Sequence, residues 1–409
     1  MKKISLLNKI LLGLVLGIAA GVIFGPSVAV VKPLGDLFLR LIRMVIVPLV
    51  FASLVVGAAS TGDVTKLGRI GGKTISYYLV TTAIAVTLGL VLGNLIKPGL
   101  GLNLDLSKAA FEAKKAPAFV DTMLNLFPTN PLAAMVEGNM LQIIVFALFV
   151  GVAITLVGQK AKPALEFFDS LAEVMYKITG MVMAFAPYGI FGLIAPVVGR
   201  YGLDIIMPLI KLILAVYIGG LLHALVVYSA SVSIFAKMSP VKFFKGIFPA
   251  TALAFSSTSS AATLPVTIKS TEDNLGVSKG VSSFVLPLGA TVNMDGTALY
   301  QGICALFVAQ VYGLELTMAQ QLQVVLAGTL ASIGAAGVPG AGLIMLTMVL
   351  TSVGLPLEGV GLVAGIDRIL DMMRTAVNVT GDASAAVVVA ATEGELQPTA
   401  VAEGPGVSA

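Results

Sequence analysis

Apolar stretches long enough to cross a lipid bilayer recur along almost the whole chain, and they limit the fold more than any other feature. Six of them lie near residues 10–30, 34–59, 74–97, 131–158, 170–199 and 203–235. A bilayer offers the backbone no hydrogen-bond partners, so a spanning chain forms helices or a closed barrel. The stretches are continuous and do not alternate with a two-residue period, which favours helices. The sequence therefore predicts an all-α polytopic membrane protein.

The charge content supports this class. Only 11% of the 409 residues are charged and 57% are hydrophobic, against about 25% charged in soluble domains. A water-soluble protein of this size could not cover its surface with so few charges. The single cysteine, Cys304, excludes an internal disulfide, and the single histidine, His223, leaves no zinc-ligand set. We expect both to be packing residues, with a proton-relay role as the alternative for His223.

Two later regions are interrupted by polar or Gly-rich segments. Region 241–273 contains FSSTSSAATLP (255–265), and region 318–352 contains ASIGAAGVPGAG (331–342). Neither half of either region reaches the ~20 residues of a span. We predict two re-entrant helical hairpins, whose tips must be buried in protein or line a wet cavity. Interrupted segments in matching positions indicate a transporter's binding site.

Each predicted hairpin precedes a long helix with an Asn-x-x-Gly sequence, NMDG (293–296) and NVTG (378–381). We interpret both as helix breaks and the pair as inverted repeats, although Gly-rich segments are common in membrane helices. The prediction is eight transmembrane helices plus two hairpins. The N-terminal stretch imitates a signal peptide, but its length favours a first transmembrane helix. The segment 394–409 is polar and predicted to be disordered.

Lysines and arginines fall at alternate loops, which predicts that both termini are cytoplasmic. The loop that carries Lys108, Lys114 and Lys115 is the exception, since it would lie outside. We also predict a cell (plasma or inner) membrane location, no nucleic-acid partner and no enzymatic activity.

The last span carries one polar stripe, formed by Asp367, Asp371, Arg374, Asn378 and Asp382. At about 100° per residue these side chains fall within roughly 80° of one another. A charge at bilayer depth costs ~2.5–3.5 kcal/mol. Pairing of Asp371 with Arg374 would leave the other aspartates unexplained. With Asp295 the buried set has a net charge of −3, which predicts bound cations held by carboxylate, amide and hydroxyl oxygens.

The same stripe suggests a substrate. An arginine in a dry site offers a bidentate fork for a carboxylate. An aspartate one turn away offers a partner for an ammonium group. Serines and backbone N–H groups at a hairpin tip would hold a main-chain carboxylate. Arg374 and Asp371 therefore predict an acidic amino acid.

At these residues the chain resembles the dicarboxylate/amino acid:cation symporters, a family that includes glutamate and aspartate transporters. The resemblance covers about residues 8–393 and is densest in SSTSSAATLPVT, LPLGATVNMDGTALYQG, ASIGAAGVPGAG and DMMRTAVNVTGD. It implies a homotrimer and an elevator mechanism. Helices 1, 2, 4 and 5 (1–72 and 99–202) would form the scaffold. Helix 3 (73–98) and residues 203–393 would form the moving transport domain, with the second hairpin as the outer gate.

The resemblance also implies residue roles. Arg374 would hold the substrate side-chain carboxylate and Asp371 its amino group, while Ser260 and Asn378 would hold the main-chain carboxylate. The rest of the implied pocket comprises Thr258, Ser259, Thr297, Val338, Gly342 and Thr375. One sodium would lie at Gly289, Asn293, Asn378 and Asp382. A second would use Thr291, Ser332, Ile333 and Ala335. A third would use Tyr78, Thr81, Thr82, Asn293 and Asp295. Sodium would be the coupling ion, and no other cofactor is implied.

The chain departs from the family pattern in its arginines. Archaeal relatives have an arginine where this chain has Thr258, and vertebrate relatives have one where it has Met372. Arg368, one turn before Met372, is expected to reach the same space. Gln301 replaces a glutamate that vertebrate relatives link to proton movement, which favours sodium.

Several alternatives stay open. Proton coupling is the alternative for the driving ion, and a C4-dicarboxylate carrier of the same fold is the alternative for the substrate. Asp371 argues against that carrier, and Arg374 argues against a neutral amino-acid carrier. An intramembrane aspartyl protease would need two carboxylates that share a proton, whereas these are interleaved with other polar groups. A dedicated channel is disfavoured by two hairpin gates. The preference between aspartate and glutamate is not determined.

Overall fold

The computed structural model describes residues 6–59, 67–102, 124, 127–332, 337 and 340–397. Within these residues every regular element is a helix, turns and short loops join the helices, and the β-structure is limited to one isolated bridge between Val277 and Leu396. Four helical stretches are apolar and long enough to cross a membrane, namely Asn8–Phe38, Arg69–Ile96, Val145–Val182 and Gly202–Ala236. These features agree with a helical membrane protein.

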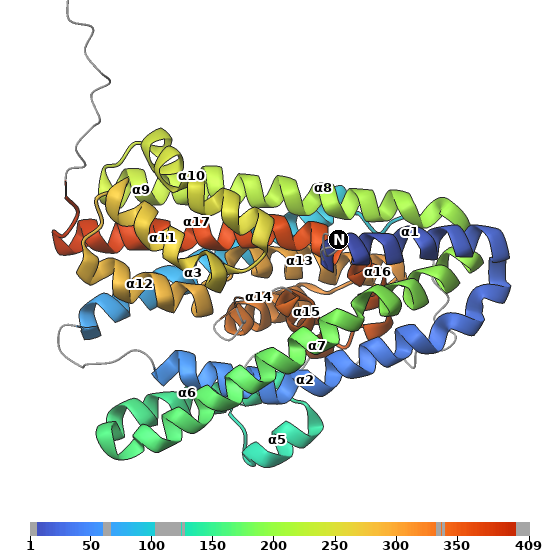
Figure 1. Cartoon of the computed structure of the whole chain (residues 1–409), viewed down its shortest axis with the longest axis horizontal. Coiled ribbons are helices and arrows are strands. Elements are labelled where there is room, and N and C mark those ends of the chain that lie inside the picture. Colours follow the sequence, from blue (N-terminus) through green and yellow to red (C-terminus); the bar gives the residue numbers. More distant parts are fainter. Residues whose placement is uncertain are drawn as a thin grey trace, which may run out of the picture.

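The first group of helices packs largely on itself and occupies the lower part of Figure 1 together with the right-hand end, where α1 lies. It comprises α1 (Leu6–Phe24), the 3-10 segment η1 (Gly25–Val31), α2 (Lys32–Ala59), α6 (Met140–Val157) and the 40-residue α7 (Lys162–Tyr201), with the short α5 (Pro131–Glu137) beside α6. Glycines let these backbones approach closely, as is usual between membrane helices. A Cβ on Gly13 of α1 would clash with the carbonyl oxygen of Pro187, and one on Gly189 of α7 would clash with Phe38.

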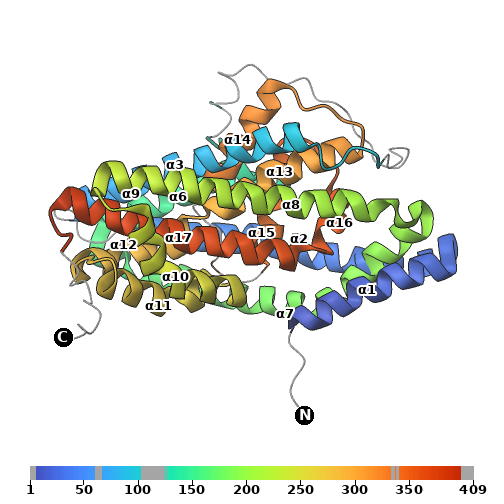
Figure 2. The ribbon, with the colours of Figure 1, turned by 90° about the horizontal axis from the view of Figure 1, so that it is seen from above.

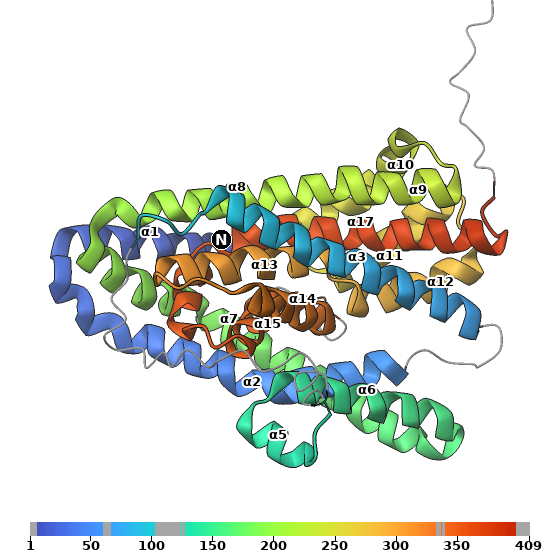
Figure 3. The ribbon, with the colours of Figure 1, turned by 180° about the vertical axis from the view of Figure 1, so that it is seen from behind.

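The second group contains most of the other helices in the described part of the chain. It comprises α3 (Leu67–Ile96), α8 (Ile206–Leu222), α9 (Ser229–Ala236), α10 (Pro240–Ser257), α11 (Ser260–Asp273), α12 (Lys279–Val292), α13 (Asp295–Val311), α14 (Met318–Ser332), α15 (Ala341–Ser352), α16 (Val360–Ala364) and α17 (Asp367–Glu393). The helix α17 lies between α8 and α10 (Figure 2), and α3 runs along α13 (Figure 3). Almost every residue of α17 is buried, so its polar stripe faces protein.

Two helix pairs correspond to the regions that the sequence predicted to be interrupted. Only Thr258 and Ser259 separate α10 from α11. The residues between α14 and α15 are described only at Gly337 and Gly340. Both joining segments contact the same cavity, which is described below.

One predicted helix break is present and the other is wrong. The chain leaves the helical conformation at Asn293 and Met294, between α12 and α13, as NMDG predicted. In contrast, α17 continues through residues 378–381 without interruption. Gly381 serves close packing instead, because a Cβ there would lie 2.5 Å from the Tyr228 hydroxyl.

Ion pairs connect the C-terminal end of α17 to the first turns of α3. The Glu393 carboxylate lies 2.6 Å from both the Lys73 ammonium and the Arg69 guanidinium, and these hydrogen bonds lower the pKa of Glu393. Residues 394–397, which the sequence placed in a disordered tail, continue into an ordered segment. The Gln397 N–H donates to the Gly276 carbonyl at 2.7 Å beside the Val277–Leu396 bridge. Residues 398–409 lie outside the described part of the chain.

Candidate functional site

A small polar cavity lies where both helix pairs meet α13 and α17. Its lining residues are Thr258, Ser260, Met294, Thr297, Gly337, Ala341, Gly342, Asp371, Thr375 and Asn378. Seven of them belong to the predicted substrate site, and Met294, Gly337 and Ala341 were not predicted. The cavity measures about 10 Å³, room for about one water molecule. An amino acid can enter only if one of the two tips moves.

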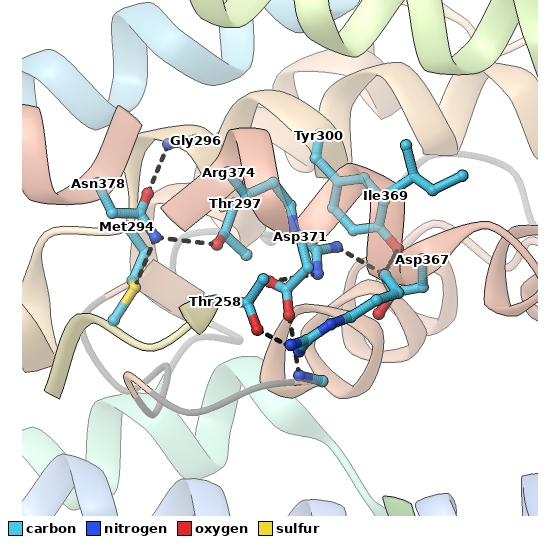
Figure 4. Close-up of polar contacts among 12 residues, drawn as sticks. Thr258, Met294, Gly296, Thr297, Tyr300, Asp367, Ile369, Asp371, Arg374 and Asn378 are labelled. Atoms are coloured by element: carbon cyan, nitrogen blue, oxygen red, sulfur yellow. Dashed lines mark hydrogen bonds and ion pairs between the residues drawn. The ribbon is translucent and has the colours of Figure 1, made fainter. Parts of the chain in front are cut away.

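Arg374 is held beside this cavity by two carboxylates (Figure 4). Its Nη1 lies 2.7 Å from Asp367 Oδ1, and its Nη2 lies 2.8 Å from Asp371 Oδ1. The guanidinium also covers the ring of Tyr300, whose centroid lies 4.2 Å from Cζ, and the Tyr300 hydroxyl donates to Asp367. The expectation that ion pairing of Arg374 would leave Asp367 unexplained is therefore wrong, because Arg374 pairs with both aspartates.

Glycine makes room for this arginine. A Cβ on Gly342 would lie 2.7 Å from Arg374 Cζ, and a Cβ on Gly296 would clash with the Arg374 carbonyl oxygen. The Gly340 N–H donates to Asp371 Oδ2 at 3.2 Å, so Asp371 joins α17 to the start of α15. The ion pair is thus packed directly against the backbone of the second tip.

Asn378 connects α17 to the break between α12 and α13. Its Oδ1 accepts from the Gly296 N–H at 2.8 Å, and its Nδ2 donates to Met294 Sδ at 3.1 Å and to Thr297 Oγ1 at 3.4 Å. The Asn378 side-chain amide therefore gives a hydrogen-bond partner to the Gly296 N–H, which the interruption between α12 and α13 leaves without a helical partner. The same amide holds Thr297 at the cavity wall.

The first tip closes the other side of the cavity. The Ser259 hydroxyl accepts from the Ala262 N–H, which caps α11, and it donates to the Gly337 carbonyl at 2.8 Å. The Ala261 N–H reaches the same carbonyl at 3.2 Å. The two tips thus contact each other directly over the cavity.

A second polar cluster surrounds Asp295, which is fully buried. Thr82 donates to Asp295 Oδ1 at 2.6 Å, Tyr228 donates to Oδ2 at 2.9 Å, and His223 Nε2 lies 3.2 Å from Oδ2. His223 and Tyr228 begin and end a π-helical segment, His223–Tyr228. In an α-helix residues five apart diverge by about 140°, so the wider π turn lets both side chains face one carboxylate.

A third cluster centres on Asp382. Asn293 Nδ2 donates to Asp382 Oδ1 at 2.9 Å and to the Asn378 carbonyl at 3.3 Å, while Asn293 Oδ1 is buried without a hydrogen-bond partner. A Cβ on Gly289 would lie 2.5 Å from both Asp382 Oδ1 and the Tyr78 hydroxyl. The residues predicted for the first sodium therefore lie together, and they offer carboxylate, carbonyl and amide oxygens, the ligands that hard cations prefer.

Other predicted cation residues are not joined to these clusters by any hydrogen bond in the described part of the chain. The hydroxyls of Thr81, Thr291 and Ser332 donate to the carbonyls of Tyr78, Leu288 and Thr329, within their own helices. Ile333, Ala335 and Val338 lie outside the described residues. The described residues also contain no group of three or more His, Cys, Asp or Glu side chains suited to a metal centre.

Sequence reasoning missed the aromatic partners of the charges. His223 and Tyr228 stood out as polar side chains within an apolar span, and that signal was available. Tyr300 carried no signal, because an aromatic residue in an apolar helix normally indicates packing. Its contact with Arg374 depends on the pairing of α13 with α17.

Comparisons with known proteins show the family to which the chain is similar over nearly its whole length. The model of the sodium:dicarboxylate symporter family matches residues 6–392. A proton/sodium-glutamate symport protein of Geobacillus stearothermophilus is 41% identical over 97% of this chain and 96% of its own. A proton/glutamate-aspartate symporter of Escherichia coli is 41% identical over 95% and 93%. A C4-dicarboxylate transport protein of Bacillus subtilis is 34% identical over 96% and 94%.

Proposed function

Because the chain belongs to the sodium:dicarboxylate symporter family, we propose that it is a secondary active transporter that couples sodium entry to the uptake of L-aspartate and L-glutamate. The observation that carries the substrate class is the buried pair of Arg374 and Asp371 at the cavity. On binding, the substrate side-chain carboxylate would replace Asp371 on Arg374. The freed Asp371 carboxylate would then accept the substrate ammonium group.

Charge supports a coupling cation. The buried aspartates Asp295, Asp367, Asp371 and Asp382 carry four negative charges, and Arg368 and Arg374 carry two positive charges, so these side chains have a net charge of −2. An acidic amino acid adds another −1. Burying this excess of negative charge is costly unless cations accompany the substrate. The oxygen-rich clusters at Asp295 and Asp382 are suited to bind them.

Two alternatives have specific support. The close relatives are named for proton as well as sodium coupling, and His223 lies against Asp295, so proton coupling is the second candidate for the driving ion. A relative is named for C4-dicarboxylates. Such a substrate has no ammonium group for Asp371, which favours amino acids here.

The architecture that we propose has eight spans and two re-entrant hairpins, α10–α11 and α14–α15. A scaffold of α1, α2, α6 and α7 would stay fixed in a homotrimer in the cell membrane, with both chain termini cytoplasmic. The second group of helices would cross the membrane as an elevator. Two observations support this architecture. Most helix contacts lie within one of the two groups, and both tips line the same cavity.

The test is uptake of radiolabelled L-aspartate and L-glutamate into proteoliposomes, with sodium and proton gradients imposed separately. We expect uptake that requires inward sodium at constant pH. Uptake driven by a proton gradient without sodium would show that the coupling ion is the proton and would refute sodium coupling. If the protein transports succinate but neither aspartate nor glutamate, the substrate is a C4-dicarboxylate and the proposed substrate class is wrong.

Gly289→Ala tests the proposed cation site. The new methyl group must displace Asp382 Oδ1 and the Tyr78 hydroxyl, so we expect the sodium concentration for half-maximal uptake to rise about tenfold, as for the loss of one good ligand contact. Gly72→Ala is the matched control, because its Cβ meets nothing within 4 Å. An unchanged sodium dependence in Gly289→Ala would contradict the site.

A further inference from the structure

The side chain of Arg368 bonds to the tip between α10 and α11. Arg368 Nη1 donates to the Thr258 hydroxyl at the first tip, while its Nε is buried without a hydrogen-bond partner. Within the described part of the chain, no carboxylate lies within ion-pairing distance of Arg368, whereas Arg374 has two. Its polar contact is therefore directed at the tip.

Thr258 is the position at which the first tip turns. It has a left-handed backbone conformation with φ 55°, which is unfavourable for a β-branched residue. Its N–H closes α10 by donating to the Ala254 carbonyl at 2.8 Å, and its hydroxyl donates to the Ser257 carbonyl at 2.6 Å. The lone pairs of that hydroxyl remain to accept from Arg368. A charged donor at this point offsets the cost of the strained turn.

Thr258 is next to the contact between the two tips at the cavity. Ser259, the next residue, donates to the Gly337 carbonyl of the second tip, and Thr258 itself lines the cavity. If Thr258 is released, the turn that presents Ser259 to Gly337 loses its anchor on α17. Arg368 thus acts on the tip contact without lining the cavity itself.

We propose that Arg368 is a positioning residue that latches the first tip to α17 through Thr258, and that it sets how readily this tip opens. The inference rests on the proposed transport function for its meaning, but the latch can be measured without substrate. Arg368 differs in this respect from Arg374, which is placed to bind the substrate carboxylate.

The test measures how often the tip opens. Thr263 of α11 is fully buried behind the tip, where its hydroxyl bonds to Ser257 and to the Ser259 carbonyl. Thr263→Cys in a Cys304→Ala background supplies one thiol, and its rate of modification by N-ethylmaleimide in membranes reports opening. We expect Arg368→Gln and Thr258→Val each to raise this rate about tenfold, the effect of losing one charge-assisted hydrogen bond. Arg368→Lys, which keeps a charged donor, should give an intermediate rate.

The double variant decides whether the two residues act together. If Arg368 works through Thr258, Arg368→Gln with Thr258→Val is no faster than either single variant. Arg40→Gln, at an exposed position of α2, is the matched control and should leave the rate unchanged. If the increases in labelling rate of the two single variants multiply in the double variant, the two residues act independently and the proposed latch is refuted. An unchanged labelling rate in Arg368→Gln with a raised KM for L-aspartate would instead make Arg368 a substrate ligand. A wild-type protein that transports no acidic amino acid would refute the proposed function, while the labelling rates would still decide the latch.

Discussion

Arg374→Gln is expected to reduce uptake of L-aspartate and L-glutamate about 100-fold, because losing one partner of a buried charge pair formed on binding costs about 2–5 kcal/mol. Glutamine can still donate a hydrogen bond, but it supplies no positive charge to a second carboxylate. The measurement is kcat/KM for both substrates in proteoliposomes under a saturating sodium gradient.

The same substitution should also destabilise the protein. Without Arg374 the carboxylates of Asp367 and Asp371, at most 6% exposed, face each other with no counter-ion. We therefore expect a lower melting temperature in detergent. The matched variant Asp367→Asn with Arg374→Gln removes one of the stranded charges, so it should recover stability without recovering uptake. Wild-type uptake of aspartate by Arg374→Gln would refute the assigned role of Arg374.

Asp371→Ala should change selectivity more than stability. In this variant Arg374 keeps its 2.7 Å pair with Asp367 and its position over Tyr300. The carboxylate for the substrate ammonium is lost, so we expect amino-acid uptake to fall about 100-fold or more. A C4-dicarboxylate such as succinate needs no ammonium partner and should bind at least as well as before. Competition of unlabelled succinate against labelled aspartate measures the change.

Asp273→Ala, at an exposed position at the end of α11, is the control for loss of one aspartate. If Asp371→Ala transports aspartate as the wild type does, the ammonium assignment fails. If it loses succinate and aspartate equally while remaining folded, Asp371 serves to hold Arg374 and the second tip, through Gly340, instead of selecting amino acids.

Together these variants distinguish the roles of Asp367 and Asp371, the two carboxylates that pair with Arg374. Asp367 is reinforced by Tyr300 and lies away from the cavity lining, so it is suited to remain on Arg374 throughout the cycle. Asp371 lines the cavity and bonds to the second tip, so it is suited to exchange partners. Binding and closure of the second tip would then be linked through one side chain, and ion and substrate would raise each other's affinity by the same factor.

The sequence alone was sufficient for features that depend on local pattern. Hydropathy identified a helical membrane protein, because lipid imposes the same demand on every span. Helical periodicity placed Asp367, Asp371, Arg374 and Asn378 on one face of the last helix, because side-chain direction within a helix follows from spacing. The interrupted region at 255–265 marked one wall of the cavity. The Asn-Met-Asp-Gly break also followed from local chemistry.

Only the tertiary structure decided which partners these groups have. NVTG and NMDG have similar sequences, yet NVTG stays helical within α17, where Gly381 leaves room for the Tyr228 hydroxyl. The sequence offered no partner for Asp367, whereas in the structure its carboxylate pairs with Arg374. The hydroxyl that receives Arg368 lies 110 residues away along the chain. Such pairings depend on how helices distant in sequence pack together, and no local pattern encodes that packing.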